Sequence, residues 1–238
     1  EVMVVQNLFI RKLGFIKEIF TSSAFGETSI QGHFYRPLQI FTYIFDYHIW
    51  GLNPLGFHLT SLVLHCFNTL LFYLIVKRLF IHKKTLVFLS LIFALHPIHI
   101  ESVTYIAGRG DVLFLLFCLL SIWLFIKGAQ EATPHIWLVP LTYGLSLITK
   151  ENSLPLPFFL IGLYFCASTF SFKISKQTML KILSILVFTM IGYTYWRLIG
   201  VVGNASNGTL SYIAYASFSE KLMTLPWTLL TYLKLFVF

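Results

Sequence analysis

Two histidines and a glutamate lie close together in the segment His96-Pro97-Ile98-His99-Ile100-Glu101. Pro97 disfavours helical geometry at the residue before it, so a helix that reaches His96 is expected to break there. The break would present two imidazoles and a carboxylate at one surface. They form a substrate-binding group, a divalent metal site or an interfacial pair of hydrogen-bonded histidines. The spacing differs from the His-Glu-x-x-His pattern of zinc enzymes, which counts against the metal.

A second group of charged residues follows along the chain. Gly108-Arg109-Gly110-Asp111 leads into an apolar run, and Lys150 and Glu151 lie in a short polar turn. Glycines let a backbone approach a ligand closely, and an arginine can bind a phosphate through two N–H groups. Arg109 and Lys150 are therefore candidate cations for a phosphate. The alternatives are an Arg–Asp pair in a loop turn and a surface Lys–Glu ion pair.

The elements that must position these residues are strongly apolar. Of the 238 residues, 57% are hydrophobic and 11% are charged, against about 25% charged residues in soluble domains. A helix needs roughly 20 apolar residues to cross a ~30 Å hydrocarbon core, and backbone groups in lipid must pair within their own segment. The clear runs are Phe57–Val76, Gly110–Ile126, Ile136–Ile148, Leu154–Phe170 and Leu180–Ile199, and the weaker ones are Leu86–Leu95 and Leu222–Phe238.

These runs predict an all-α fold, a polytopic transmembrane helical bundle with about seven spans. The short run Leu86–Leu95 is either extended across Pro97 to Ile100 or buried as a partial span. We expect a single domain over residues 1–238, with an outer loop at 1–56 and the bundle at 57–238. The chain starts without Met or signal peptide and ends within an apolar run. We therefore expect it to be truncated at both ends, with at least one helix before residue 1.

The charges of the loops indicate their orientation. Three alternating loops carry eight basic residues and one acid, Glu131, and we assign them to the cytoplasm. The basic residues are Lys77, Arg78, Lys83, Lys84, Lys127, Lys173, Lys176 and Lys181. The other face holds the remaining eight acids, and charge near hydrocarbon usually persists for a reason. The net charge of +8 is spread over membrane loops, so anionic lipids or a lipid phosphate are expected partners and nucleic acid is not.

The first outer loop is expected to hold two helices that do not span the membrane. Residues 8–20 place apolar side chains at helical spacing and predict an amphipathic interfacial helix. Leu38–Trp50 is too short and too polar to span and predicts a re-entrant or surface-lying helix over the site. Pro37 suits its first turn, where a missing N–H costs nothing.

Three motifs occur in an order and spacing that resemble a known family. The first is Arg36-Pro37-Leu38 followed by Gly51-Leu52-Asn53-Pro54-Leu55-Gly56-Phe57-His58. The second joins the His96–Glu101 segment to Gly108-Arg109-Gly110-Asp111, and the third is Thr149-Lys150-Glu151. Together they resemble the membrane portion of the transmembrane-and-tetratricopeptide-repeat O-mannosyltransferases and their bacterial relatives, of the GT-C class. The resemblance runs over nearly the whole chain, although the family's tetratricopeptide repeats are not in it.

The resemblance implies a membrane glycosyltransferase. It would move a mannose-like hexose from a polyprenyl-phosphate donor to a protein or glycan acceptor, with protein Ser/Thr hydroxyls as acceptors in the eukaryotic branch. The reaction would take place on the periplasmic face of a bacterial inner membrane, or on the lumenal face of the endoplasmic reticulum in a eukaryote. Its partners would be the lipid-linked donor, the acceptor and membrane lipids. No cofactor is expected, with a divalent cation at His96, His99 and Glu101 as the alternative.

The implied chemistry assigns roles to the candidate residues. A sugar leaving a phosphate passes through an oxocarbenium-like state, and the phosphate needs cations more than a proton donor. The binding residues would be Arg36, His96, His99, Arg109, Lys150 and Glu151. The acceptor hydroxyl needs a carboxylate base, for which the candidates are Glu1, where the family's acidic motif would end, Glu101 and Asp111.

Two other classes remain open from the residues alone. A polytopic transporter also carries intramembrane charges and broken helices, but here the polar residues gather on one face and no inverted repeat is visible. A noncatalytic membrane scaffold would need no cluster of charged residues at one end. The glycosyltransferase hypothesis predicts that the candidate residues from 99 to 151 converge on one outward cavity.

Overall fold

The computed structural model describes residues 4–11, 14, 16–21, 35–79, 83–131, 134–166, 174–198 and a few positions between 217 and 231. Within these residues every regular element is helical, which confirms the predicted all-α class. The α-helices are α1 (Ile16–Thr21), α2 (Pro37–Trp50), α3 (Pro54–Leu79), α4 (Lys83–Leu95), α5 (Ile100–Thr104), α6 (Arg109–Glu131), α7 (Val139–Thr149), α8 (Leu156–Phe165) and α9 (Lys176–Trp196). Short 3-10 turns are η1 (Leu8–Arg11), η3 (Pro97–His99), η4 (Ile106–Gly108), η5 (Pro134–Leu138) and η6 (Glu151–Ser153).

Three of the described helical segments are long and apolar enough to cross a membrane. They are Pro54–Leu79, Ile106–Glu131 and Lys176–Trp196. A fourth is formed if Lys83–Leu95 and Pro97–Thr104, which meet at an angle of 41°, act as one broken span. The chain is thus a membrane protein with three or four candidate spans. The expected count of about seven is not confirmed, because α7 and α8 have only 11 and 10 residues and 222–238 lies largely outside the described residues.

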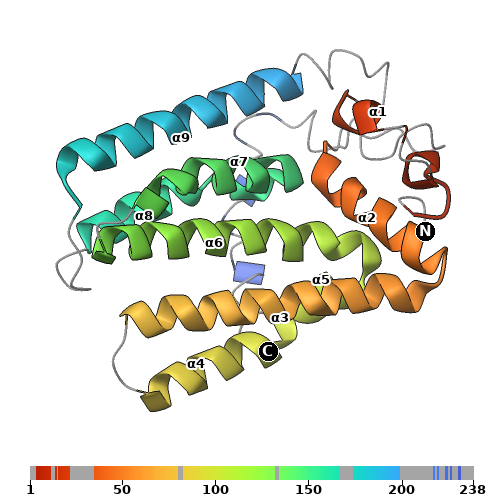
Figure 1. The fold of residues 1–238 in the computed structure, drawn as a ribbon, viewed down its shortest axis with the longest axis horizontal. Coiled ribbons are helices and arrows are strands. Elements are labelled where there is room, and N and C mark those ends of the chain that lie inside the picture. Colours follow the sequence, from red (N-terminus) through yellow and green to blue (C-terminus); the bar gives the residue numbers. More distant parts are fainter. Residues whose placement is uncertain are drawn as a thin grey trace.

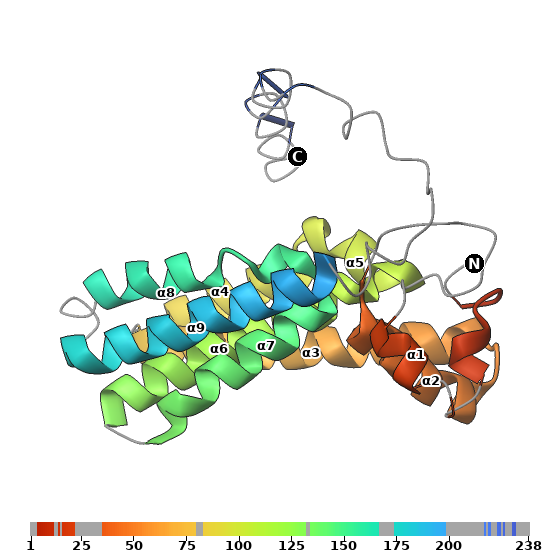
Figure 2. The ribbon, with the colours of Figure 1, turned by 90° about the horizontal axis from the view of Figure 1, so that it is seen from above.

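The long helices lie side by side. In Figure 1, α3, α6, α7 and α9 follow one another as roughly parallel rods, with α4 against α3. The short helix α5 lies at one end of this bundle, the same end as α2, as Figure 2 shows from above. We call this the α5 end. The ion pair of Arg78 with Glu131, at 2.7 Å, joins the last turns of α3 and α6 at the opposite end. This agrees with the predicted alternation of the loops.

The core is built around α6, which packs against both α3 and α7. Apolar side chains of α6, α7, α8 and α9 fill it, with Phe125, Leu147, Leu160 and Ile182 completely buried. Hydrogen bonds between side chains reinforce the packing, as between the hydroxyls of Ser121 and Thr142, 2.6 Å apart. Such polar contacts contribute to helix association in lipid, where the hydrophobic effect between helices is absent.

The predicted break at Pro97 is confirmed. His96 has ψ 129°, outside the helical region. The backbone N–H of Ile98 donates to His96 Nδ1 at 3.2 Å. On the other side of the break, His65 Nε2 lies 3.1 Å from the carbonyl oxygen of Ala94 in the last turn of α4. Two imidazoles therefore form hydrogen bonds with backbone groups that the interruption of the helix leaves without a helical partner, as a broken helix in lipid requires.

Helix α2 matches the predicted short helix and lies across the α5 end, packed on α3 and α7. Two side chains dock it. Gln39 Nε2 donates to the carbonyl of Ala107 at 2.9 Å, and the Tyr43 hydroxyl donates to the carbonyl of Ile106 at 2.6 Å. In residues 8–20, by contrast, the described residues form η1 and the short α1 in place of one amphipathic helix. Gly14 lies between them, and glycine disfavours helix interiors.

Candidate functional site

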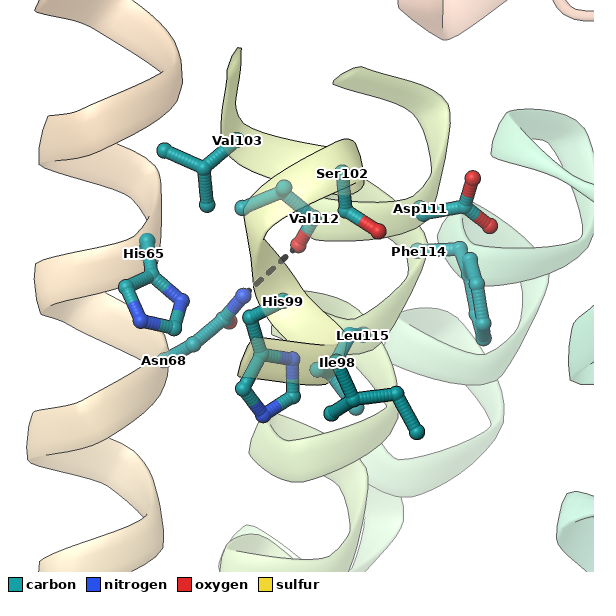
Figure 3. Close-up of a pocket in the computed structure, with 10 residues that line it drawn as sticks. All are labelled: His65, Asn68, Ile98, His99, Ser102, Val103, Asp111, Val112, Phe114 and Leu115. Atoms are coloured by element: carbon teal, nitrogen blue, oxygen red, sulfur yellow. Dashed lines mark hydrogen bonds between the residues drawn. The ribbon is translucent and has the colours of Figure 1, made fainter. Parts of the chain in front are cut away.

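A cavity of about 230 Å³ lies at the α5 end between α3, η3, α5 and α6. Figure 3 shows its lining, with His65 and Asn68 on α3 facing side chains of the break and of the first turns of α6. The lining residues are His65, Asn68, Ile98, His99, Ser102, Val103, Asp111, Val112, Phe114 and Leu115. The cavity reaches the surface, because Ile98 is exposed and the Asp111 side chain is 35% exposed.

Aromatic rings hold His99 at the wall of this cavity. The ring centroid of His99 lies 5.2 Å from that of His65 and 4.8 Å from that of Phe93. Phe93 in turn stacks on Phe72 of α3 at 4.5 Å. His99 is therefore fixed by packing in the wall of the cavity.

Asn68 is the most enclosed polar side chain of the lining. It is completely buried, and its Nδ2 donates to the backbone carbonyl of Val112 at 2.8 Å. Its Oδ1 is buried and accepts no hydrogen bond among the described residues. Figure 3 shows the Asn68 side chain in the same part of the lining as the rings of His65 and His99.

Two ion pairs link helix ends at the α5 end, and one of them contains Asp111 of the cavity lining. Lys150 Nζ lies 2.5 Å from Asp111 Oδ1, so the turn after α7 is tied to the first turn of α6. Glu151 Oε1 lies 3.5 Å from an Arg197 guanidinium nitrogen, which ties the same turn to the end of α9. Lys150 is 15% exposed and Arg197 is 26% exposed. Two cations thus lie at this end, each beside a carboxylate.

Arg109, the other expected phosphate cation, points elsewhere. Its side chain is 0% exposed and lies 2.5 Å from the carboxylate of Asp46. It also donates to the carbonyl of Phe57 at 2.7 Å and to Ser61 and Thr42 at 3.3 Å. The guanidinium further lies 4.6 Å from the ring centroid of Tyr43. Arg109 thus donates hydrogen bonds to residues of α2 and α3 and joins these helices to α6. It does not line the cavity.

The remaining predicted residues are scattered over the same end. His96 caps η3, Glu101 is exposed in the first turn of α5, and Arg36 precedes α2 and is half-buried. Glu1 lies outside the described residues. The described part of the chain contains no group of three His, Cys, Asp or Glu side chains that could hold a metal ion. Of the residues expected to converge, His99 and Asp111 share the cavity, and Lys150 joins them through Asp111.

Sequence reasoning missed the polar face of α3. Ser61, His65 and Asn68 are all buried and are spaced by four and three residues, so they lie on one face of the helix. Polar side chains inside a membrane helix usually mark a functional or packing surface. That periodicity within the run Phe57–Val76 was the signal that could have located them. Arg197 was also missed, because it is an isolated charge inside the run Leu180–Ile199.

Comparisons with known proteins point to one family. Residues 37–196 match the family model described as dolichyl-phosphate-mannose-protein mannosyltransferase. Protein O-mannosyl-transferase TMTC3 of Homo sapiens is 35% identical over 103 residues, which is 43% of this chain and 11% of that protein. No solved structure matches the chain.

Two further relatives carry the same description. Protein O-mannosyl-transferase F38B6.6 of Caenorhabditis elegans is 30% identical over 157 residues, 63% of this chain and 22% of that protein. Protein O-mannosyl-transferase TMTC2 of Mus musculus is 42% identical over 124 residues, 50% of this chain and 15% of that protein. The matched regions thus span only about a tenth to a fifth of the length of these relatives.

Proposed function

The chain belongs to the dolichyl-phosphate-mannose-protein mannosyltransferase family, and from this premise we propose that it moves a mannose-like hexose from a polyprenyl-phosphate donor to a protein hydroxyl. The family and its named relatives are glycosyltransferases, and this favours an enzyme over a transporter or a scaffold. The donor, the acceptor and the face of the membrane are part of the proposal.

The observation that carries it is the ion pair between Lys150 and Asp111 beside the cavity. Asp111 lines the cavity and Lys150 Nζ lies 2.5 Å from its carboxylate. A cation and a carboxylate are the two groups that the reaction needs, one for the leaving phosphate and one for the acceptor proton. Their burial is partial, so a ligand can reach both.

The reaction would proceed as follows. The bond between the anomeric carbon and the phosphate oxygen breaks, and its electron pair stays with the phosphate, whose charge Lys150 stabilises. The acceptor hydroxyl oxygen bonds to the anomeric carbon, and its proton passes to a carboxylate. Asp111 is the base that the geometry favours, because phosphate binding to Lys150 would release its carboxylate from the ion pair. Glu101 and Glu1 stay as alternative bases.

The active face would be the α5 end, on the periplasmic or lumenal side of the membrane. The basic residues of the opposite end support this orientation, because Lys and Arg are enriched in cytoplasmic loops. They include Lys77 and Arg78 at the end of α3, and Lys127 near the end of α6. Arg197 would be a second cation for the donor phosphate, since its partner Glu151 directly follows Lys150.

The test is an in vitro transfer assay with the full-length protein, labelled polyprenyl-phosphate mannose and an acceptor peptide rich in Ser and Thr. Lys150→Ala should lower kcat by about a hundredfold or more, the usual cost of losing one group that stabilises transition-state charge. Lys150→Arg should keep part of the activity. The matched control is Lys127→Ala. The Lys127 ammonium lies 4.8 Å from the ring centroid of Trp123 near the opposite end, so this variant should have the activity of the wild type.

Two results would count against the proposal. A wild-type protein that transfers no mannose from this donor would exclude the reaction. Full activity of Lys150→Ala would leave the reaction standing but remove the phosphate site from Lys150.

A further inference from the structure

One buried acceptor in the cavity has no partner among the described residues. Asn68 is 0% exposed, its Nδ2 is bound to the Val112 carbonyl, and its Oδ1 accepts no hydrogen bond. Leaving a buried polar atom unpaired costs about 1–3 kcal/mol. Such atoms are rare in folded proteins, and each one needs an explanation, such as a ligand that supplies the missing donor.

The geometry of Asn68 holds this acceptor in place. The hydrogen bond from Nδ2 to Val112 at 2.8 Å joins α3 to the first turns of α6 and fixes which atom of the amide is free. His65 and His99 line the same cavity as this side chain. A fixed acceptor discriminates between ligands that carry a donor at the right place and ligands that lack it.

The size of the cavity limits what the donor can be. Pockets for drug-sized ligands are typically about 300–1,000 Å³, and this cavity has about 230 Å³. It is too small for a peptide or for a length of isoprenoid chain, and it suits a single sugar ring. Its lining combines apolar and aromatic groups such as Phe114 and Leu115 with a few polar ones, as a pyranose with apolar C–H faces and hydroxyl edges requires.

We propose that this cavity is the subsite for the sugar ring of the donor, and that Asn68 is a specificity-determining residue whose Oδ1 accepts a hydrogen bond from one sugar hydroxyl. The proposal rests on the proposed function and adds where the sugar lies. Asp111 lines the same cavity and joins it to Lys150. The sugar would thus lie directly beside the cation assigned to its phosphate.

The experiment compares donors that differ by one hydroxyl. The full-length protein is assayed with polyprenyl-phosphate mannose and with its 2-, 3-, 4- and 6-deoxy analogues. In the wild type, one deoxy donor should lose roughly tenfold to a hundredfold in kcat/KM, because it leaves Oδ1 unpaired. In Asn68→Leu the kcat/KM for the mannose donor should fall by a similar factor. The further loss with that one deoxy donor should disappear, since the substitution and the missing hydroxyl remove the same contact.

A matched control separates this effect from a general loss of helix packing. Ser121→Ala removes a buried hydrogen bond between α6 and α7 that does not border the cavity. This variant should therefore rank the deoxy donors by kcat/KM in the same order as the wild type. If Asn68→Leu fails to fold, Val103→Phe serves in its place, because it adds bulk to the cavity wall and leaves the Asn68 amide intact. It should raise the KM for the donor tenfold or more.

The outcomes distinguish the two proposals. If the wild type transfers mannose but Asn68→Leu keeps every deoxy penalty, or a folded Val103→Phe keeps its KM, the sugar lies elsewhere and the proposed function survives. If the wild type transfers no sugar, both proposals are wrong.

Discussion

The guanidinium of Arg109 lies 2.5 Å from the carboxylate of Asp46, and the two side chains are 0% and 5% exposed. Thr60 completes the pair by donating to the other Asp46 oxygen at 2.7 Å. Arg109 opens α6 and Asp46 lies in α2, so this contact attaches the helix across the α5 end to the spanning bundle. Arg109 thus has a structural role in this contact, and the phosphate-binding role that its Gly-Arg-Gly-Asp setting suggests stays a prediction.

Removing Arg109 should therefore reduce stability before it affects chemistry. Arg109→Ala leaves Asp46 as a buried, unpaired charge, and breaking a buried pair costs about 3–5 kcal/mol. Thermal unfolding of purified Arg109→Ala in detergent should show a much lower Tm than that of the wild type. The double variant Arg109→Met/Asp46→Leu should recover a large part of the lost Tm. An Arg109→Ala protein with the wild-type Tm and a raised KM for the donor would instead identify Arg109 as a phosphate ligand.

Tyr43 should make the attachment of α2 sensitive to alkaline pH. Burial raises the pKa of Tyr43 from 10.0 to about 12, so the folded protein favours the protonated hydroxyl that donates to Ile106. This stabilisation is complete below the unfolded pKa of about 10 and is lost as pH rises toward 12. Tyr43→Phe should lower the Tm by an amount that is constant between about pH 7 and 9 and shrinks above about pH 10. A gap that stays constant through this upper range would contradict the assignment.

Gly128 should not tolerate a side chain. A Cβ there would lie 2.6 Å from Ile136 Cβ and 2.9 Å from the Ile136 backbone nitrogen, and the backbone of η5 cannot yield as a flexible side chain would. Gly128→Ala should cost about 1–3 kcal/mol through overpacking, measured as a lower Tm. Gly144→Ala is the control, because its Cβ would meet nothing nearer than Thr189 Cγ2 at 3.6 Å. It should be neutral or gain up to about 1 kcal/mol of helix propensity.

The long helices were predictable because their apolar runs are continuous. Phe57–Val76 lies within α3, and Gly110–Ile126 within α6. The shorter runs were less informative, because prolines near their starts delay the α-helix. The run from Ile136 begins as a 3-10 turn, and α7 starts only at Val139, with Pro140 in its first turn. A count of apolar residues in a run does not register the effect of these prolines, although each lacks the N–H that a helix interior needs.

The candidate site was predictable where local sterics decide and not where long-range packing does. The break at His96 follows from Pro97 alone. The partner of Arg109 depends on which face of α6 turns toward α2, and the sequence offers several carboxylates that could meet it. Lys150 is predictable as a cation, but its pairing with Asp111 joins two turns that lie far apart in the sequence. Asn68 was overlooked because one amide hardly changes the hydropathy of a long apolar run.

The interrupted helix also has a thermodynamic consequence for any ligand. His65 and His96 form hydrogen bonds with the backbone on the two sides of the break, and the tilted rings of Phe93 and His65 pack against His99 beyond it. That wall is ordered before anything enters, so its conformational entropy is lost once, during folding, and not again at each encounter. The affinity of a ligand for such a preorganised wall is set by its contacts and by the water it displaces. The wall does not rearrange to improve the affinity of a ligand that is smaller or carries its hydroxyls at other positions.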